Sequence, residues 1–241
     1  VGDNWSACVT PNDGSEDGAR VCSSNVTILA ADNILPTVDT MVLNTTDIST
    51  NLTNTNLTLY FNSTDADADL VKNITNWYKN GTSITLLNMP FEKVNGTTTN
   101  NSVDYSGYGK NGDVSGATWN ATGGFGGKGA YEFDGTDDYI TTNSIPLANQ
   151  DFTLEAWARR TTIGSYDLIL WEGTDTDSNG LQFGFRDNNM FMFAFWGNDL
   201  DTISYTDTNW HHWVGTYNAG SRNRTIYRDS VIVGNDIASS N

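Results

Sequence analysis

Residues 131–160 read YEFDGTDDYITTNSIPLANQDFTLEAWARR, a succession of strand patterns separated by turns. The run FTLEAWA at 152–158 alternates apolar and polar side chains, which is the pattern of a strand with one buried face. Ahead of it, YEFDG ends in an Asp-Gly turn and DDYITT resumes in β-prone residues. Short strands separated by turns predict an all-β domain here.

The rest of the chain has the composition of a β-protein as well. Its 241 residues suffice for one large β-domain or two smaller ones. Ile, Val, Thr, Tyr, Phe and Trp recur in short runs between Gly, Asn and Asp turns, and no long helical pattern occurs. The net charge of −17 argues against nucleic acid and anionic membranes as partners, because no basic patch is present. An acidic surface fits solubility, divalent-cation binding or a salty environment.

Asn-x-Ser/Thr sequons are dense and favour N-glycosylation of an exported protein. Ten of the twelve fall within the first 100 residues. They are Asn4, Asn25, Asn44, Asn51, Asn56, Asn62, Asn73, Asn80, Asn95, Asn100, Asn120 and Asn223.

The two cysteines point to the same compartment. Cys8 and Cys22 lie in two strand-like runs joined by a Gly/Asp-rich turn, and we expect a disulfide across this hairpin. The alternative is a reduced, buried pair. The chain opens with a polar run and has no apolar stretch of membrane-spanning length. We therefore expect a mature or internal piece of a secreted, cell-surface protein.

The first 95 residues carry strand patterns that do not complete a domain. Residues 1–30 resemble the last two strands of archaeal immunoglobulin-like or cadherin-like surface repeats. Residues 34–95 resemble the early strands of an immunoglobulin-like sandwich, with Trp77 in the place of its central tryptophan. Two strands cannot bury a core alone, so residues 1–30 either pair with later strands or complete a domain elsewhere. Polar residues 96–103 are the expected linker.

From residue 104 onward the aromatic and Gly content rises. Three runs keep a characteristic order: GAYEFDGTDDYI at 129–140, FTLEAW at 152–157 and WHHWVGTY at 210–217. Residues 104–241 thereby resemble the laminin-G-like domain of the concanavalin A-like lectin/glucanase superfamily. The resemblance implies a jelly-roll sandwich, so the expected fold class is all-β: immunoglobulin-like strands plus a concanavalin A-like jelly roll. Domains of this family end with two further strands, which we expect adjoining chain or a second subunit to supply by strand addition.

Three oxygen-rich loops are candidate metal sites. Their spacing lets carboxylates converge as hard ligands for Ca²⁺, which is the candidate cofactor. The alternative for each is a polar turn; Ala68 replaces the usual Gly of one loop, and the family resemblance implies that Asp134 accepts backbone hydrogen bonds in its turn. The candidate ligands are Asp65, Asp67 and Asp69; Asp134, Asp137 and Asp138; and Asp175 and Asp177, with Asn179.

A candidate sugar platform follows from the alternation in residues 190–196. It places Phe191, Phe193 and Phe195 in the core. Met192, Ala194 and Trp196 then face outward, where the Trp196 ring can stack on a sugar. The alternative is a strand covered by a loop or a neighbouring domain.

No catalytic set is evident in the sequence. The resemblance implies that glycan-cleaving relatives place two carboxylates on one strand, whereas Glu155 is the only acid in 152–160. The adjacent His211 and His212 face opposite ways on a strand and cannot chelate one metal. We therefore expect a non-enzymatic protein.

Two functions remain. The first is an extracellular structural protein, a cell-surface or filament subunit that assembles by strand pairing with copies of itself or adjoining segments of a longer surface protein. The second is a glycan-binding adhesin module that uses Ca²⁺.

Overall fold

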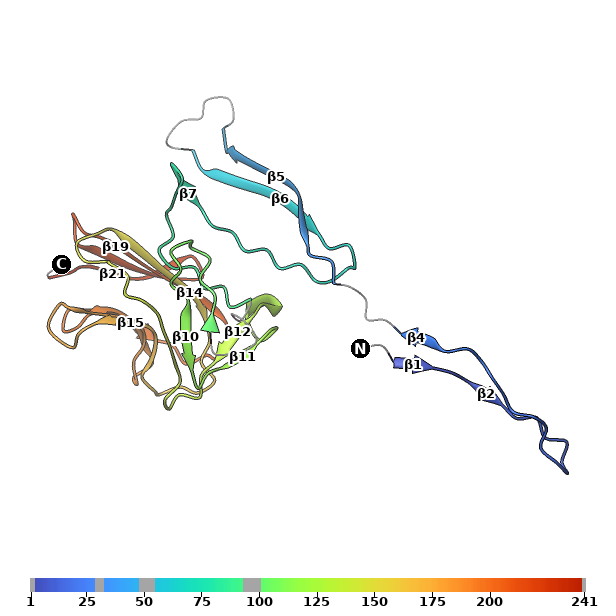
Figure 1. Ribbon diagram of the computed structural model, residues 1–241. Coiled ribbons are helices and arrows are strands. Elements are labelled where there is room, and N and C mark those ends of the chain that lie inside the picture. Colours follow the sequence, from blue (N-terminus) through green and yellow to red (C-terminus); the bar gives the residue numbers. More distant parts are fainter. Residues whose placement is uncertain (1–2, 29–32, 48–54, 93–100, 240–241) are drawn as a thin grey trace. The chain divides into compact units, whose positions relative to one another are not determined.

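The computed structural model describes residues 3–28, 33–47, 55–92 and 101–239. The chain divides into two compact units, Val1–Asn73 and Ile74–Asn241. As predicted, the fold is all-β and its strands pair in antiparallel sheets (Figure 1). The described residues contain one short helical turn, η1 (Phe125–Gly127). They contain no helix with the length and apolar character needed to span a membrane.

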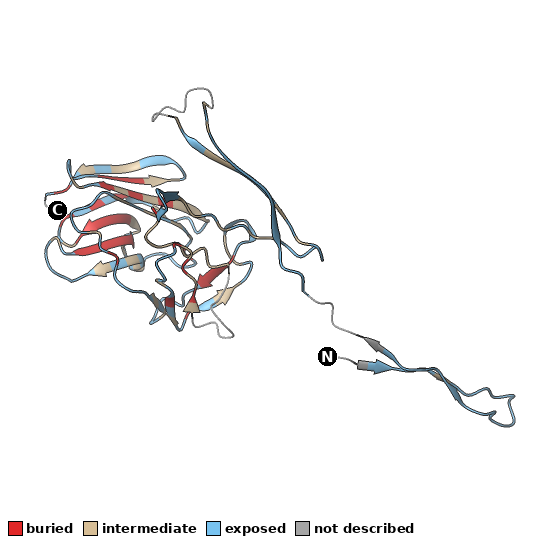
Figure 2. Cartoon of the chain, turned by 45° about the horizontal axis from the view of Figure 1, so that its top comes forward, coloured by how far each residue is buried: buried red, intermediate tan, exposed pale blue. Residues whose placement is uncertain are grey.

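The first unit begins with a thin, disulfide-linked hairpin. β1 (Asp3–Trp5) pairs with β4 (Val26–Ile28), and β2 (Cys8–Val9) pairs with β3 (Val21–Cys22). Trp5 is 65% exposed, and the figure shows the hairpin in the exposed colour along most of its length (Figure 2). The hairpin therefore has no core of its own among the described residues.

The second hairpin of this unit joins β5 (Thr37–Thr45) and β6 (Leu57–Thr64), drawn side by side in Figure 1. The register shifts once, between Val38 and Thr40, and then runs regularly to Thr45 opposite Leu57. Within the described ranges neither strand has a second partner. Within the described ranges the first unit thus has three separate two-stranded sheets, two in the first hairpin and one in the second, and the immunoglobulin-like character of these strands stays a prediction.

The second unit opens with short strands around the jelly roll. The strand β10 (Gly112–Ser115) lies between β9 (Asn101–Ser102) and β13 (Tyr139–Thr141). Two further pairs are β7 (Tyr78–Lys79) with β8 (Thr82–Ser83), and β11 (Thr118–Asn120) with β12 (Ala130–Glu132).

Two four-stranded sheets make the jelly roll. The first sheet, named here the β14 sheet, runs in the order β14 (Phe152–Ala158), β19 (His211–Asn218), β20 (Asn223–Arg228), β21 (Val231–Ile237). The second, the β17 sheet, runs in the order β15 (Asp167–Gly173), β16 (Gly180–Phe185), β17 (Met190–Phe195), β18 (Asp199–Ser204). Residues 152–158 form the predicted strand, and its residues alternate between half-buried and exposed along its length.

An aromatic core lies between the two sheets. Phe191 and Phe193 of β17 are completely buried, as the alternation predicted, and Trp213 of β19 is 1% exposed. The Phe191 and Trp213 rings stack face to face with centroids 3.9 Å apart. Burial of such large side chains contributes roughly 1.5–3 kcal/mol each, so this cluster dominates the stability of the second unit.

The division between the units falls ahead of the linker expected over 96–103. Residues 74–92 pack with the second unit: the Trp119 indole N–H donates to the Phe91 carbonyl (2.7 Å), and the Asn76 amide donates to the Ser106 carbonyl (2.9 Å). Residues 96–100 lie outside the described ranges, but Ser102 is completely buried in β9. Trp77 precedes a strand of only two residues instead of lying within one.

Candidate functional site

The outer face of the β17 sheet is the first candidate surface. Met192 and Ala194 face away from the aromatic core, as the alternation predicted, yet both are completely buried. Other side chains of the second unit therefore cover the middle of this face.

Arg186 provides part of that cover. It follows β16, and its Nε donates to Asp201 Oδ1 (2.8 Å) while an Nη donates to Asp199 Oδ2 (2.6 Å). Both carboxylates lie on β18, on the far side of β17, and Met192 stands opposite Asp201 in the register. The guanidinium must cross β17 to reach them, so it lies over Met192.

Tyr166 and Gln182 complete the cover beside Arg186. The Tyr166 hydroxyl lies 3.4 Å from Gln182 Oε1 and 3.5 Å from Met192 Sδ. Burial raises the pKa of Tyr166, which favours its neutral hydroxyl form. Trp171, directly opposite Gln182, is 52% exposed and Tyr166 is 48% exposed. Two accessible aromatic rings thus border a polar surface of guanidinium and carboxylate groups, while the Gln182 amide beneath them is 6% exposed.

Trp196, the expected sugar platform, is half-buried. It follows the end of β17 with a φ of 31°, and its carbonyl accepts the Ser178 N–H (2.9 Å). The strand alternation therefore stops one residue before it. Trp171 ends the apolar run LILW at 168–171, and an apolar run that ends in Trp is also the sequence signal that drew attention to Trp196. Neither Trp171 nor Tyr166 was predicted from the sequence as part of a binding surface.

Two of the three acidic clusters bring their carboxylates together. Oxygens of Asp65, Asp67 and Asp69 lie within 4.8 Å of one another, and so do oxygens of Asp134, Asp137 and Asp138. Asp175 and Asp177 join no such group in the part of the chain that the structure describes.

Hydrogen bonds within the turns already engage the two clusters. Asp65 Oδ1 accepts the N–H groups of Asp67 (3.1 Å) and Asp69 (3.3 Å). A side-chain hydrogen bond between the Asp65 and Asp67 carboxyls raises the pKa of Asp65 and lowers that of Asp67. In the other cluster Asp134 Oδ1 accepts the Thr136 N–H (2.8 Å), which is the turn-supporting bond implied by the family resemblance. Ca²⁺ binding at either cluster stays a prediction.

The two adjacent histidines face different groups. His211 lies between two carboxylates, with Nε2 2.6 Å from Asp207 and Nδ1 2.6 Å from Asp229. His212 stacks on the Trp157 ring at 5.2 Å, and its Nε2 is 3.7 Å from Glu155. The imidazoles therefore do not converge on one ion, in agreement with the strand argument.

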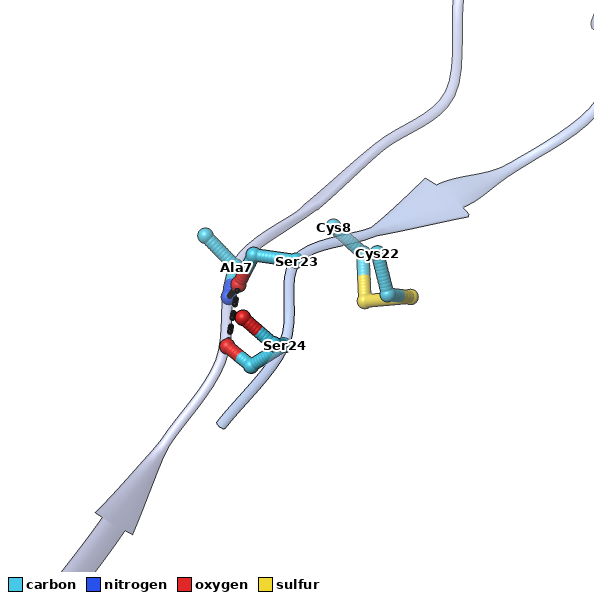
Figure 3. Close-up of a disulfide and its surroundings, with 5 residues drawn as sticks. All are labelled: Ala7, Cys8, Cys22, Ser23 and Ser24. Atoms are coloured by element: carbon cyan, nitrogen blue, oxygen red, sulfur yellow. Dashed lines mark hydrogen bonds between the residues drawn. A yellow bond between two sulfur atoms is a disulfide. The ribbon is translucent and has the colours of Figure 1, made fainter. Parts of the chain in front are cut away.

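The expected disulfide links Cys8 and Cys22, which stand directly opposite each other in β2 and β3 (Figure 3). Next to it the Ala7 N–H donates to Ser23 Oγ (3.1 Å), and that hydroxyl donates to the Ser24 carbonyl (3.0 Å). A disulfide is typical of oxidising compartments outside the cytosol.

Most of the sequon asparagines lie on the surface. Asn120 is half-buried, and its amide donates to Glu132 Oε1 (3.0 Å). Asn51, Asn95 and Asn100 lie outside the described residues. The exposed ones are Asn4, Asn25, Asn44, Asn56, Asn62, Asn73, Asn80 and Asn223.

The comparisons with known proteins find a similarity in the jelly roll. Residues 134–241 match the family described as the concanavalin A-like lectin/glucanases superfamily, so this part of the chain is similar to that family. None of the curated proteins compared matches the chain. Among solved structures, an S-layer domain-containing protein from Clostridium thermocellum is similar, with 21% identity and a TM-score of 0.41. The match covers 65% of this chain and 74% of that one.

Proposed function

We propose that the protein is a non-enzymatic structural module of a cell surface, which assembles with copies of itself by strand pairing. The β5–β6 hairpin carries the proposal. Its strands are nine and eight residues long, and neither has a second partner within the described ranges. A two-stranded sheet is marginally stable in water, and an unpaired edge is a template for a further strand.

The sequence of β6 supports strand addition. LTLYFNST contains no charged residue and no Pro, which are the residues that commonly block sheet edges. Because the chain carries a net charge of −17, copies repel one another over most of their surface. An uncharged strand lets two copies meet without bringing carboxylates together.

The lack of an enzymatic activity is part of the proposal. Glu155 is the single acid on β14, and its carboxylate lies 3.7 Å from His212 Nε2. Retaining and inverting glycoside hydrolases need two carboxyl groups across the scissile bond. The disulfide and the exposed sequons support a location outside the cell.

The assembly state of the glycosylated chain tests this function. Sedimentation over a hundredfold concentration range, with electron microscopy of the same samples, should show oligomers or filaments that grow with concentration and with added salt. Samples treated with EDTA separate metal-bridged assembly from metal-free strand pairing. If the chain is a monomer at every concentration, in salt and with or without Ca²⁺, the proposed structural function is wrong.

Glycan binding is the second candidate, favoured by the exposed rings on the β17 sheet. Trp171 and Tyr166 lie on the face that carries Arg186 and its partners Asp199 and Asp201, and a sugar site combines aromatic faces with such hydrogen-bonding groups. Binding to a glycan array should be lost in Trp171→Ala and retained in Trp196→Ala. Equal loss in both variants, or no binding by the unaltered chain, would contradict this site. Binding that persists in EDTA would exclude a role for Ca²⁺.

A further inference from the structure

The β5–β6 hairpin has two faces of different chemistry. Residues directly opposite each other in an antiparallel pair project to the same side of the sheet. Met41 stands opposite Phe61, and Leu43 stands opposite Leu59. We call this side the apolar face. Its apolar residues are Met41, Leu43, Leu57, Leu59 and Phe61, and Thr45, opposite Leu57, lies at its end.

The opposite face collects glycosylation sequons. Asn44 stands opposite Thr58, and Asn62 stands opposite Thr40. Asn56, one residue before Leu57, continues the alternation, and its carbonyl accepts the Thr46 N–H (2.8 Å). All three sequon asparagines of the hairpin's described residues are exposed on this side, which we call the sequon face.

The apolar face is exposed to an unusual degree. Met41 is 70% exposed, Leu57 58%, Leu43 54% and Phe61 40%. A contiguous apolar surface of this kind marks an interaction site in a folded protein. None of its residues carries a charge, so a charged partner finds no group to pair with.

We propose that N-glycans on Asn44, Asn56 and Asn62 keep the sequon face in solvent, and that the apolar face packs against the apolar face of a second copy of this hairpin. The inference rests on the proposed function and deepens it: strand pairing joins copies at the edges of the hairpin, and the inference assigns the face on which the hairpin of a second copy packs and the modification that directs it there. Two hairpins packed in this way form a two-layered sandwich with both sets of apolar side chains inside.

N-glycans on the sequon face leave only the apolar face available for packing against a second sheet. An N-linked glycan is bulky and hydrophilic, so three on one face prevent a second sheet from packing there. The local hydrogen bonds tolerate the modification: the Asn62 amide donates to Asp39 Oδ2 (3.1 Å), and a glycosylated amide nitrogen keeps one N–H for this bond.

A second copy is the occupant that suits the charge of the chain. Each copy carries −17, so an interface between copies requires a patch without carboxylates. The apolar face is such a patch, and a twofold contact places it against itself. A hydrophobic contact of this kind strengthens when salt screens the remaining repulsion.

Matched substitutions on the two faces test the inference in the full, glycosylated chain. L43T/F61T removes two side chains from the apolar face, and V42T/Y60T removes their neighbours from the sequon face. Val42 is 50% exposed and Tyr60 61%, so the control is comparable in character, and Thr suits a strand in both. By sedimentation, self-association should weaken at least tenfold in L43T/F61T and less than twofold in V42T/Y60T. Equal effects would overturn the inference.

A relocated glycan gives a second, independent readout. L43N creates a sequon at position 43, because Thr45 stands two residues later. L43N/T45A carries the same substitution without that sequon, and Asn44 keeps its own through Thr46. Association should fall at least tenfold further in L43N than in L43N/T45A, with the added glycan confirmed by glycopeptide mass spectrometry.

The outcomes separate the inference from the proposed function. If the unaltered chain assembles and both apolar-face variants assemble equally well, the copies meet elsewhere and only the inference fails. If the unaltered chain is monomeric under all conditions, both fail. A monomer that binds neutral phosphatidylcholine vesicles, and loses this binding in L43T/F61T, would assign the face to a lipid surface and overturn the second copy as occupant. Unoccupied Asn44, Asn56 and Asn62 in protein from its natural source would overturn the directing role of the glycans.

Discussion

Arg224 and Asp236 form a bidentate ion pair in which the arginine side chain is only 1% exposed and the carboxylate 32%. Arg224 Nε lies 2.9 Å from Asp236 Oδ1, and an Nη lies 2.6 Å from Oδ2. The guanidinium also donates to the Asn198 carbonyl and side chain, between β17 and β18. One buried cation therefore connects the two sheets of the jelly roll.

Replacing Asp236 by Asn should destabilise the second unit strongly. The substitution leaves the buried Arg224 charge without its counterion, which commonly costs about 3–5 kcal/mol; partial exposure of the carboxylate reduces the expected loss to about 2–4 kcal/mol. Urea unfolding followed by near-UV circular dichroism measures it. Asp187→Asn, at an exposed position, is the control and should change the free energy of unfolding by less than about 0.5 kcal/mol. Equal effects of the two variants would contradict this role of the pair.

Gly215 of β19 should not tolerate a methyl group. A Cβ at this position would lie 2.8 Å from Phe183 Cε2 and 3.1 Å from Phe193 Cδ1, both in the aromatic core. Overpacking of this kind costs about 1–3 kcal/mol, so Gly215→Ala should lower the free energy of unfolding by that amount. At Gly220 the nearest atom would be Asn218 Oδ1 at 3.6 Å, so Gly220→Ala serves as the control in the same urea titration. An unchanged free energy of unfolding in Gly215→Ala would show that the core has room for the methyl group.

Acid should weaken the second unit through Asp207 and Asp229. Burial alone would raise the pKa of each, but hydrogen bonds and charge from His211 and Arg228, with the His212 N–H at Asp229, outweigh it and lower both. A carboxyl with a lowered folded-state pKa contributes stability above its unfolded pKa, near 4, and loses it as pH falls through the folded value. The melting temperature should therefore drop steeply below about pH 4.

Asp207→Asn provides the matched measurement for this pH dependence. The variant should melt at a lower temperature than the unaltered chain at pH 6 and approach it at pH 2, because the unaltered carboxyl is protonated there. If the melting temperatures of the two proteins differ by the same amount from pH 6 to pH 2, Asp207 is not the source of the acid sensitivity.

Local alternation in the sequence was enough to predict much of the jelly roll. The run 152–158 formed its strand, and Phe191 and Phe193 entered the core, because burial of one face imposes a period of two. The burial of Met192 was not predictable in this way. It depends on Arg186 reaching across β17 to β18, a contact set by strand order and not by the local pattern.

In the β5–β6 hairpin of the first unit, too, local alternation predicts only part of the arrangement. Alternation alone places Leu57 and Phe61 on one side of β6. The same alternation places Asn56 and Asn62 on the other side, but only the register between the strands shows that Met41 joins the apolar side and that Asn44 joins the asparagines. A one-residue slip would have mixed the two classes on both faces.

The Cys8–Cys22 disulfide should decide whether the first hairpin resists proteolysis. This hairpin buries little, so closing the loop between the cysteines, on the order of 3 kcal/mol in the chain-entropy model, is the main contribution to its order. Arg20 lies inside the loop, next to β3, and offers a trypsin site.

In the oxidised protein, cleavage after Arg20 should be slow, and its two products should stay joined on a non-reducing gel. Cys8→Ser/Cys22→Ser should be cleaved there at least tenfold faster, whereas cleavage at Lys110 in the second unit should be unchanged and report that this unit stays folded. Equal rates after Arg20 in the two proteins would show that strand pairing in β1–β4 suffices to hold the hairpin without the disulfide.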